Sequence, residues 1–272
     1  MTNSCHFYDL LACYARWCSS FNGITLVMRL ILIYALLKIG VHLIKGIWIL
    51  LLVFPFCTAH EQQQRIRLWC YKLLLLFNID LVIRDGDCLG QGGYLLVANH
   101  ISWIDIHVIN AFRPHYFVAK SEVASWPIFG WMAKKLGTLF IERERAQSLR
   151  NTVMQMADLL QVQAICIFPE GTSSDGMQIR PFKSNVFEAA ILAQAPIYSV
   201  AIQYFLVHSG EKTPAPAFTG EMGLLDSITT LLRAPAINAE LTFLPVLLPG
   251  HDRKTLAEAS QGLIASRLRK YF

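Results

Sequence analysis

The segment Asn99-His-Ile-Ser-Trp-Ile-Asp105 carries a histidine and an aspartate five positions apart. On one continuous helix this offset turns the two side chains about 140° away from each other. They can meet if His100 lies in a turn and Asp105 lies in the first turn of a following helix. The carboxylate would then fix the imidazole tautomer, and the second ring nitrogen would be free to remove a proton from an alcohol. We therefore predict a general base, His100, oriented by Asp105.

A structural interpretation of the same segment is also open. Ser102-x-x-Asp105 matches a helix N-cap followed by an acidic residue at the third position, a pattern that requires no catalysis. Ser102 can cap the helix while Asp105 faces His100, so the two roles are compatible. His107 and His115 have no acidic neighbour at this spacing, and we interpret them as structural or surface residues.

A second polar segment, Phe168-Pro-Glu-Gly-Thr-Ser-Ser174, follows the most apolar predicted strand of the chain. At the end of a strand, the Glu170 carboxylate can accept hydrogen bonds from substrate hydroxyls. Gly171 lets a ligand approach the backbone, and Thr172 adds a short donor. An ordinary turn is the alternative interpretation of this pattern.

Two cations follow predicted elements near these segments. Lys183 lies in Pro181-Phe-Lys183, and Arg143 follows the predicted strand at 139–141. Either residue alone would more often be a solvated surface charge. The planar donor fork of a guanidinium suits a phosphate or carboxylate headgroup, so we favour Arg143 within its charge run. The seven cysteines lack the Cys-x-x-Cys spacing of a metal or redox site, and we predict neither a metal nor a cofactor.

Beyond residue 59, short apolar runs alternate with helical segments, which favours the α/β class. We predict one α/β domain over residues 59–272, with a central, mostly parallel or mixed sheet flanked by helices. A polar hinge at 60–65 leads into a helix that ends at residue 77. Strands are predicted at 79–84, 94–98, 115–119, 139–141, 164–168, 197–203 and 240–247, and helices at 102–112, 146–160, 183–193 and 253–271, with 125–135 a helix or loop and 210–220 a loop.

Residues 1–58 are predicted to associate with a membrane. The chain is 54% apolar and only 16% charged. Its net charge of +5 suits anionic headgroups. The sequence lacks the clustered Lys and Arg that a nucleic-acid-binding protein usually has. Lys38, His42 and Lys45 form one basic helical stripe, which is typical of a helix lying in the interface. We predict two helices, broken near Gly40 or Gly46, that enter one leaflet; one tilted transmembrane helix is the alternative.

Four blocks in the region 99–200 resemble, in type and order, those of the glycerolipid acyltransferase family, typified by 1-acylglycerol-3-phosphate acyltransferase. The blocks are His100-x4-Asp105, Gly137-x-x-Phe140-Ile-x-Arg143, Phe168-Pro-Glu-Gly171 with Thr172, and Ala195-Pro-Ile-Tyr-Ser-Val200. The resemblance implies acyl transfer from acyl-CoA or acyl-carrier protein to the hydroxyl of a membrane lipid, without a covalent enzyme intermediate. It implies that Arg143, Glu170 and Gly171 bind the acceptor headgroup, with Lys120 as a further candidate.

One position departs from the family pattern. Members that form phosphatidic acid usually read Phe-Pro-Glu-Gly-Thr-Arg-Ser, and here Ser173 replaces the arginine. We expect lysophosphatidic acid as acceptor, with lyso-ornithine lipid as the alternative that Ser173 favours. The expected location is the inner membrane, with the site facing the cytoplasm. A non-catalytic lipid-binding protein is a remote alternative, and a serine hydrolase lacks its Gly-x-Ser-x-Gly elbow.

Overall fold

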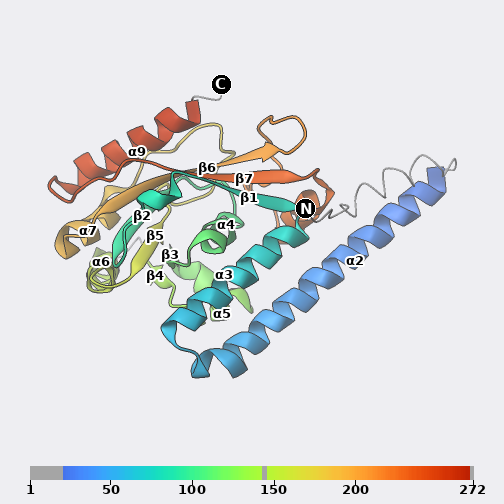
Figure 1. Cartoon of the computed structure of the whole chain (residues 1–272), viewed down its shortest axis with the longest axis horizontal. Helices are drawn as coiled ribbons and strands as arrows, with labels where there is room; N and C mark the ends of the chain where they lie inside the picture. Colours follow the sequence, from blue (N-terminus) through green and yellow to red (C-terminus); the bar gives the residue numbers. More distant parts are fainter. Residues whose placement is uncertain (1–20, 143–145, 270–272) are drawn as a thin grey trace.

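The central strand of the protein is a run of five apolar residues, β2 (Tyr94–Ala98), that is buried throughout. Strands of this kind need cover on both faces, and successive side chains point to opposite sides. Leu95 and Val97 accordingly join one hydrophobic core, while Tyr94, Leu96 and Ala98 join another. The computed structural model describes residues 21–142 and 146–269, and its helices lie on both sides of the sheet (Figure 1).

Seven strands form one mixed sheet in the order β1-β7-β6-β2-β5-β3-β4. All neighbouring pairs are parallel except β6 and β7, which are antiparallel. The predicted single α/β domain with a mostly parallel or mixed sheet is confirmed. The other strands are β1 (Ile79–Arg84), β3 (Tyr116–Lys120), β4 (Leu139–Ile141), β5 (Ala164–Ile167), β6 (Ile197–Leu206) and β7 (Ile237–Phe243).

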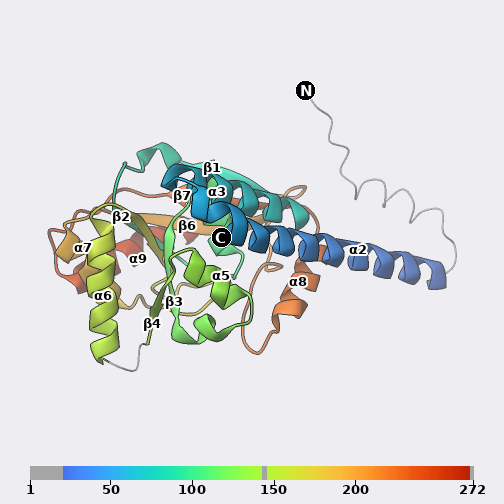
Figure 2. The same cartoon turned by 90° about the horizontal axis from the view of Figure 1, so that it is seen from below.

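The helices form two layers. Apolar residues of α2, α3, α4 and α8 pack on one face of the sheet, and those of α6, α7 and α9 pack on the other. Figure 2, turned by 90°, shows the first layer from its outer side. The helices are α2 (Phe21–Trp48), α3 (Ala59–Leu76), α4 (Asp105–Phe112), α5 (Phe129–Lys135), α6 (Ala146–Leu160), α7 (Glu188–Ala193), α8 (Leu224–Arg233) and α9 (Arg253–Arg269), with 3-10 turns at 54–56, 86–88, 121–125 and 184–187.

Several predicted boundaries were wrong. α4 begins at Asp105 and not at 102, since the residues after β2 form a turn. β7 (Ile237–Phe243) begins three residues and ends four residues earlier than predicted, and α8 was not predicted at all. The predicted polar hinge at 60–65 is helical, because Thr58 and Glu61 form a reciprocal capping box that starts α3 at Ala59. The chain instead bends at 54–58, where Pro55 interrupts the helix.

The N-terminal helix α2 runs without a break through Gly40 and Gly46, so the predicted break is wrong. A glycine inside a helix costs about 1 kcal/mol relative to alanine, but Gly46 gains a close contact. A Cβ atom there would lie 2.7 Å from Nε1 of Trp69 on α3. α2 then passes into a π-helical turn at Ile49–Val53.

The predicted basic stripe of α2 is divided between two environments. Lys38 and Lys45 are exposed, but His42 is buried and stacks on the Trp69 ring with centroids 4.5 Å apart. His42 Nε2 lies 3.1 Å from the Trp69 carbonyl oxygen, and Trp69 Nε1 donates to the His42 carbonyl. The prediction that His42 belongs to a basic stripe at the membrane interface is therefore wrong. Residues 26–56 form a helical stretch long and apolar enough to cross a membrane.

Candidate active site

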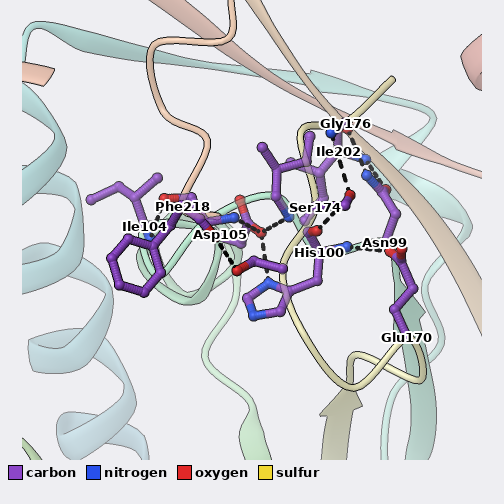
Figure 3. A network of polar contacts seen from close by, with 12 residues as sticks. Asn99, His100, Ile104, Asp105, Glu170, Ser174, Gly176, Ile202 and Phe218 are labelled. Carbon is purple, nitrogen blue, oxygen red and sulfur yellow. Dashed lines mark hydrogen bonds and ion pairs between the residues drawn. The ribbon is translucent and has the colours of Figure 1, made fainter. Parts of the chain in front are cut away.

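The residue before His100, at the start of the loop after β2, is held by hydrogen bonds. Asn99 is buried and pairs with the backbone of Ile202 on β6: its Nδ2 donates to the carbonyl at 3.1 Å, and its Oδ1 accepts from the N–H at 2.8 Å. Ser174 holds the next residue, donating to the His100 carbonyl from its backbone N at 2.9 Å. Figure 3 shows these contacts around the turn. The backbone around His100 is thus positioned by strand β6 on one side and by the loop after β5 on the other.

The His100 and Asp105 side chains contact each other in the predicted arrangement of a turn followed by the start of a helix. His100 lies in the turn, Asp105 is the first residue of α4, and His100 Nδ1 is 2.9 Å from Asp105 Oδ2 (Figure 3). The Asp105 side chain is fully buried, whereas that of His100 is 19% exposed. Since a carboxylate can only accept, the shared proton belongs to His100 Nδ1, and Nε2 carries the free lone pair. No described residue bonds to Nε2.

Asp105 has four hydrogen-bond donors. Its Oδ2 also accepts from the backbone N–H groups of Ile101 and Ser102, at 2.7 and 2.8 Å. Its Oδ1 accepts from the hydroxyl of Tyr204 on β6 at 2.6 Å. The hydroxyl of Ser102, which was predicted to cap the helix, accepts a long 3.4 Å bond from Ile104 N, and the Ser102 carbonyl accepts from Asp105 N at 3.1 Å. These four donors satisfy both oxygens of the buried carboxylate and hold it where it can stabilise an imidazolium on His100.

The face of the His100 ring is held by Phe168. The two rings stack with centroids 4.2 Å apart and an interplanar angle of 19°. Phe168 itself follows β5 and stacks further on Phe117 of β3, at 6.1 Å. The ring therefore has two restraints, the Asp105 carboxylate in its plane and an aromatic side chain on its face, which limit its rotation and aim Nε2.

Glu170 lies beside the pair, and both of its oxygens accept backbone hydrogen bonds. Oε1 accepts from His100 N at 2.8 Å, and Oε2 accepts from Arg180 N at 3.0 Å. Glu170 is buried, and this burial raises the pKa of its carboxyl, an effect that the two backbone donors oppose. In this structure Glu170 joins the His100 turn to the loop at 180. A headgroup contact of Glu170 stays a prediction.

The other predicted binding residues are near the same edge of the sheet but more exposed. Gly171 has φ 80°, a conformation that favours glycine, and its N–H closes a turn onto the Phe168 carbonyl at 3.0 Å. Thr172 and Lys183 are exposed, as is Lys120 at the end of β3. Arg143 lies outside the described residues. The structure thus joins His100, Asp105 and Glu170 directly, and the binding roles of the remaining residues stay predictions.

Sequence reasoning missed the contribution of the loop before α8. The Ser173 hydroxyl donates to the carbonyl of Phe218, and Phe218 N donates to the Ile101 carbonyl at 3.0 Å. Phe218 is therefore held against the turn that carries His100 (Figure 3). Tyr204 was also missed, because it lies 99 residues from Asp105. A buried tyrosine in a run of apolar strand residues was the one available signal, since its hydroxyl requires a partner.

His107 and His115 are neutral structural residues in this fold. Burial lowers the pKa of each to about 4. His115 Nδ1 is 2.6 Å from the Arg113 carbonyl, so it donates there, and Nε2 is 2.9 Å from the Tyr94 hydroxyl. His107 packs between Trp69 and Trp103. Within the described residues, no three His, Cys, Asp or Glu side chains are grouped to hold a metal ion.

The fold and the site geometry agree with comparisons to known proteins. Residues 77–203 match the family model Acyltransferase. The chain is 33% identical to lyso-ornithine lipid O-acyltransferase of Pseudomonas aeruginosa over 74% of its own length and 76% of the relative, and 33% identical to 1-acyl-sn-glycerol-3-phosphate acyltransferase of Neisseria gonorrhoeae over 57% and 60%. The solved structure of PlsC, the 1-acyl-sn-glycerophosphate acyltransferase of Thermotoga maritima, has the same fold, with a TM-score of 0.66 at 20% identity over 89% of this chain and 94% of that chain.

These comparisons identify the chain as a member of the acyltransferase family. A further relative, a lyso-ornithine lipid O-acyltransferase of Brucella abortus, is 36% identical over 64% of this chain and 70% of the relative. The protein is therefore an enzyme of the acyltransferase class. The helical stretch at 26–56 agrees with association with a membrane.

Proposed function

We propose that the protein transfers a fatty acyl group from a thioester donor, acyl-CoA or acyl-carrier protein, to the hydroxyl of lyso-ornithine lipid. His100 serves as the general base, and the reaction proceeds without an acyl-enzyme intermediate. The observation that carries the proposal is the pairing of His100 Nδ1 with the buried Asp105 carboxylate, which leaves Nε2 as a base beside partly open space.

The proposed reaction has two steps. His100 Nε2 takes the proton of the acceptor hydroxyl as its oxygen attacks the thioester carbonyl carbon. When the resulting tetrahedral intermediate collapses, the carbon–sulfur bond breaks and the thiol leaves with the proton from Nε2. Between these steps the imidazolium is stabilised by the Asp105 carboxylate, which its hydrogen-bond donors hold in place.

The reaction is tested by comparing two histidines with different surroundings. His100→Gln keeps a polar side chain but removes the base, and we expect release of thiol from the donor to fall by about a thousandfold or more. His208→Gln is the matched control, because His208 is exposed in the turn after β6. Full activity of the His100 variant, measured with purified protein in detergent, would refute the proposal.

The acceptor assignment depends on Ser173. A phosphate monoester carries up to two negative charges and favours a guanidinium fork, which this position lacks. The Ser173 hydroxyl bonds instead to the Phe218 carbonyl. An ornithine headgroup combines a carboxylate with an ammonium and therefore needs less compensating positive charge. The Pseudomonas and Brucella relatives, named for lyso-ornithine lipid, also align over a larger share of this chain than the Neisseria relative.

Lysophosphatidic acid is the second candidate acceptor, since relatives of comparable identity carry that name. Both lipids should be offered to the purified enzyme with labelled donor, and we expect the larger kcat/KM for lyso-ornithine lipid. Ser173→Arg should shift the ratio of the two values toward lysophosphatidic acid, by roughly tenfold for one added ion pair. Ser173→Ala removes the hydroxyl without adding charge and should leave the ratio unchanged.

The location and orientation of the enzyme belong to the same proposal. We place the protein at the inner membrane with His100 facing the cytoplasm, where thioester donors are made. The exposed Lys38 and Lys45 on α2 support this orientation, because positively charged residues are favoured on the cytoplasmic side. Labelling of Lys45 in sealed inverted vesicles, but not in right-side-out cells, is the expected result.

A further inference from the structure

The segment that leads from β3 into the start of α5 exposes four consecutive apolar residues, 126–129, with the sequence Trp-Pro-Ile-Phe. We call these four residues the apolar tip. None of them belongs to the two hydrophobic cores that cover the sheet. Trp126 is 44% exposed, Ile128 50% and Phe129 38%, and Pro127 is exposed as well. Single exposed apolar residues are common on soluble proteins, but a contiguous group of large ones marks an interaction site.

The tip holds its shape under backbone strain. Ile128 has φ 64° and ψ −60°, and Phe129 N donates to the Pro127 carbonyl at 2.7 Å, which closes a three-residue γ-turn. A β-branched residue rarely adopts a positive φ. Gly130 keeps the turn packed on its base, because a Cβ atom there would lie 2.5 Å from the Ala124 carbonyl oxygen. Strain of this kind persists mainly where it serves a function.

The tip lies at the edge of the sheet that carries His100. β2 runs parallel to β5, and β5 runs parallel to β3, so the carboxyl ends of all three strands share one edge. His100 follows the end of β2, and the tip follows the end of β3 after the turn at 121–125. Figures 1 and 2 both place α5 on the side of the sheet that α2 and α3 cover.

The charges around the tip are mostly positive. Lys120 at the end of β3 and Lys134 and Lys135 at the end of α5 are exposed, and Glu122 is the one carboxylate between residues 120 and 135. Lysines at the margin of an apolar group can keep their ammonium groups among anionic headgroups while the apolar side chains enter the acyl region. Tryptophan is the residue most typical of that boundary.

We propose that the apolar tip inserts into the bilayer as a second membrane contact, in addition to α2. The exposed apolar face of α2, which includes Leu37, Val41 and Ile44, lies on the same side of the sheet and provides the first contact. Two contacts on one side fix the rotation of the domain about α2. They turn the edge with His100 toward the bilayer surface, from which a single-chain lipid enters.

The full-length protein in vesicles tests insertion directly, through quenching of tryptophan fluorescence by lipids brominated in their acyl chains. Trp126→Phe keeps the tip apolar and removes its fluorophore, so the quenched share of the emission should decrease. Trp103→Phe is the control, because Trp103 is partly buried and donates to Ser227 Oγ at 3.0 Å; this change should not decrease the quenched share. The measurement requires no activity, so it stands apart from the proposed function. An unchanged quenched share in the Trp126 variant would overturn the proposal.

A kinetic experiment tests the consequence. Trp126→Glu with Phe129→Glu should raise KM for an acceptor presented in vesicles about tenfold and leave KM for the same lipid in detergent micelles unchanged. Val162→Glu is the matched control, because Val162 is 66% exposed in the turn before β5, at the opposite edge. If the double variant instead raises KM for acyl-carrier protein in detergent, the tip is a donor-docking surface and the membrane proposal is refuted.

Discussion

Replacing Asp105 with asparagine removes one charge and changes little of the geometry. The asparagine oxygen can still accept from His100 Nδ1 and from the N–H groups of Ile101 and Ser102, while its amide meets the Tyr204 hydroxyl, which can rotate to accept. What is lost is the attraction between the carboxylate and the imidazolium that forms when His100 takes a proton. The effect should therefore appear in the chemical step.

The magnitude follows from the distance. With Nδ1 and Oδ2 2.9 Å apart, the centres of the two charges are about 4 Å apart, which gives about 4 kcal/mol at an effective dielectric constant of about 20. Since about 1.4 kcal/mol corresponds to a tenfold change in rate, kcat should fall by up to about a thousandfold. Asp105 is fully buried and cannot touch the acceptor, so KM should change little.

The assay is steady-state thiol release by purified protein in detergent, with both substrates varied. Asp226→Asn, on the exposed surface of α8, is the matched control and should keep the original kcat. Thermal unfolding of both variants separates a loss of catalysis from a loss of fold. A folded Asp105→Asn enzyme whose kcat is within threefold of the original would show that no charge develops on His100, and the general-base mechanism would be refuted.

Three further changes test the surrounding structure. Tyr204→Phe leaves one oxygen of the buried aspartate without its 2.6 Å donor, so the free energy of unfolding should fall by about 1–3 kcal/mol and kcat by about tenfold, checked by denaturant titration and kinetics. Burial lowers the pKa of His115 to about 4, so the unfolded state takes up a proton at a higher pH than the folded state does. The free energy of unfolding should therefore decrease by up to about 3 kcal/mol as the pH falls from about 6.5 to 4. His115→Gln should reduce that dependence on pH. Gly93→Ala would place a Cβ atom 1.8 Å from a carbonyl oxygen at the end of α6 and should cost about 3 kcal/mol or more, whereas Gly40→Ala, with open space around it, should not destabilise the protein.

The elements that the sequence predicted well are those with local causes. The strand at 94–98 was placed correctly because an apolar run bounded by Gly93 and Asn99 has few alternatives. The pairing of His100 with Asp105 could be stated as a condition, namely a turn followed by a helix start. The class of chemistry followed from that condition, since a histidine held by a carboxylate is suited to deprotonate an alcohol.

Other features depended on contacts that no local pattern contains. Gly40 and Gly46 suggested a break in α2, but the packing of Gly46 against Trp69 of α3 favours a continuous helix. His42 belonged to a basic stripe by spacing, yet stacking on Trp69 turned it inward. In both cases the contact joins residues more than twenty positions apart, and helix periodicity alone does not report which face finds a partner.

The site itself shows the same division. The order of residues shows which groups are present and what chemistry they suit: a base, its orienting carboxylate and a polar loop after a buried strand. How these groups are held depends on the fold. In the folded protein, Tyr204 on β6 donates to Asp105, and both oxygens of Glu170 accept from backbone N–H groups, including that of His100. The reason is physical: buried polar atoms must find partners, and the folded sheet, not the order of residues along the chain, determines which partners are within reach.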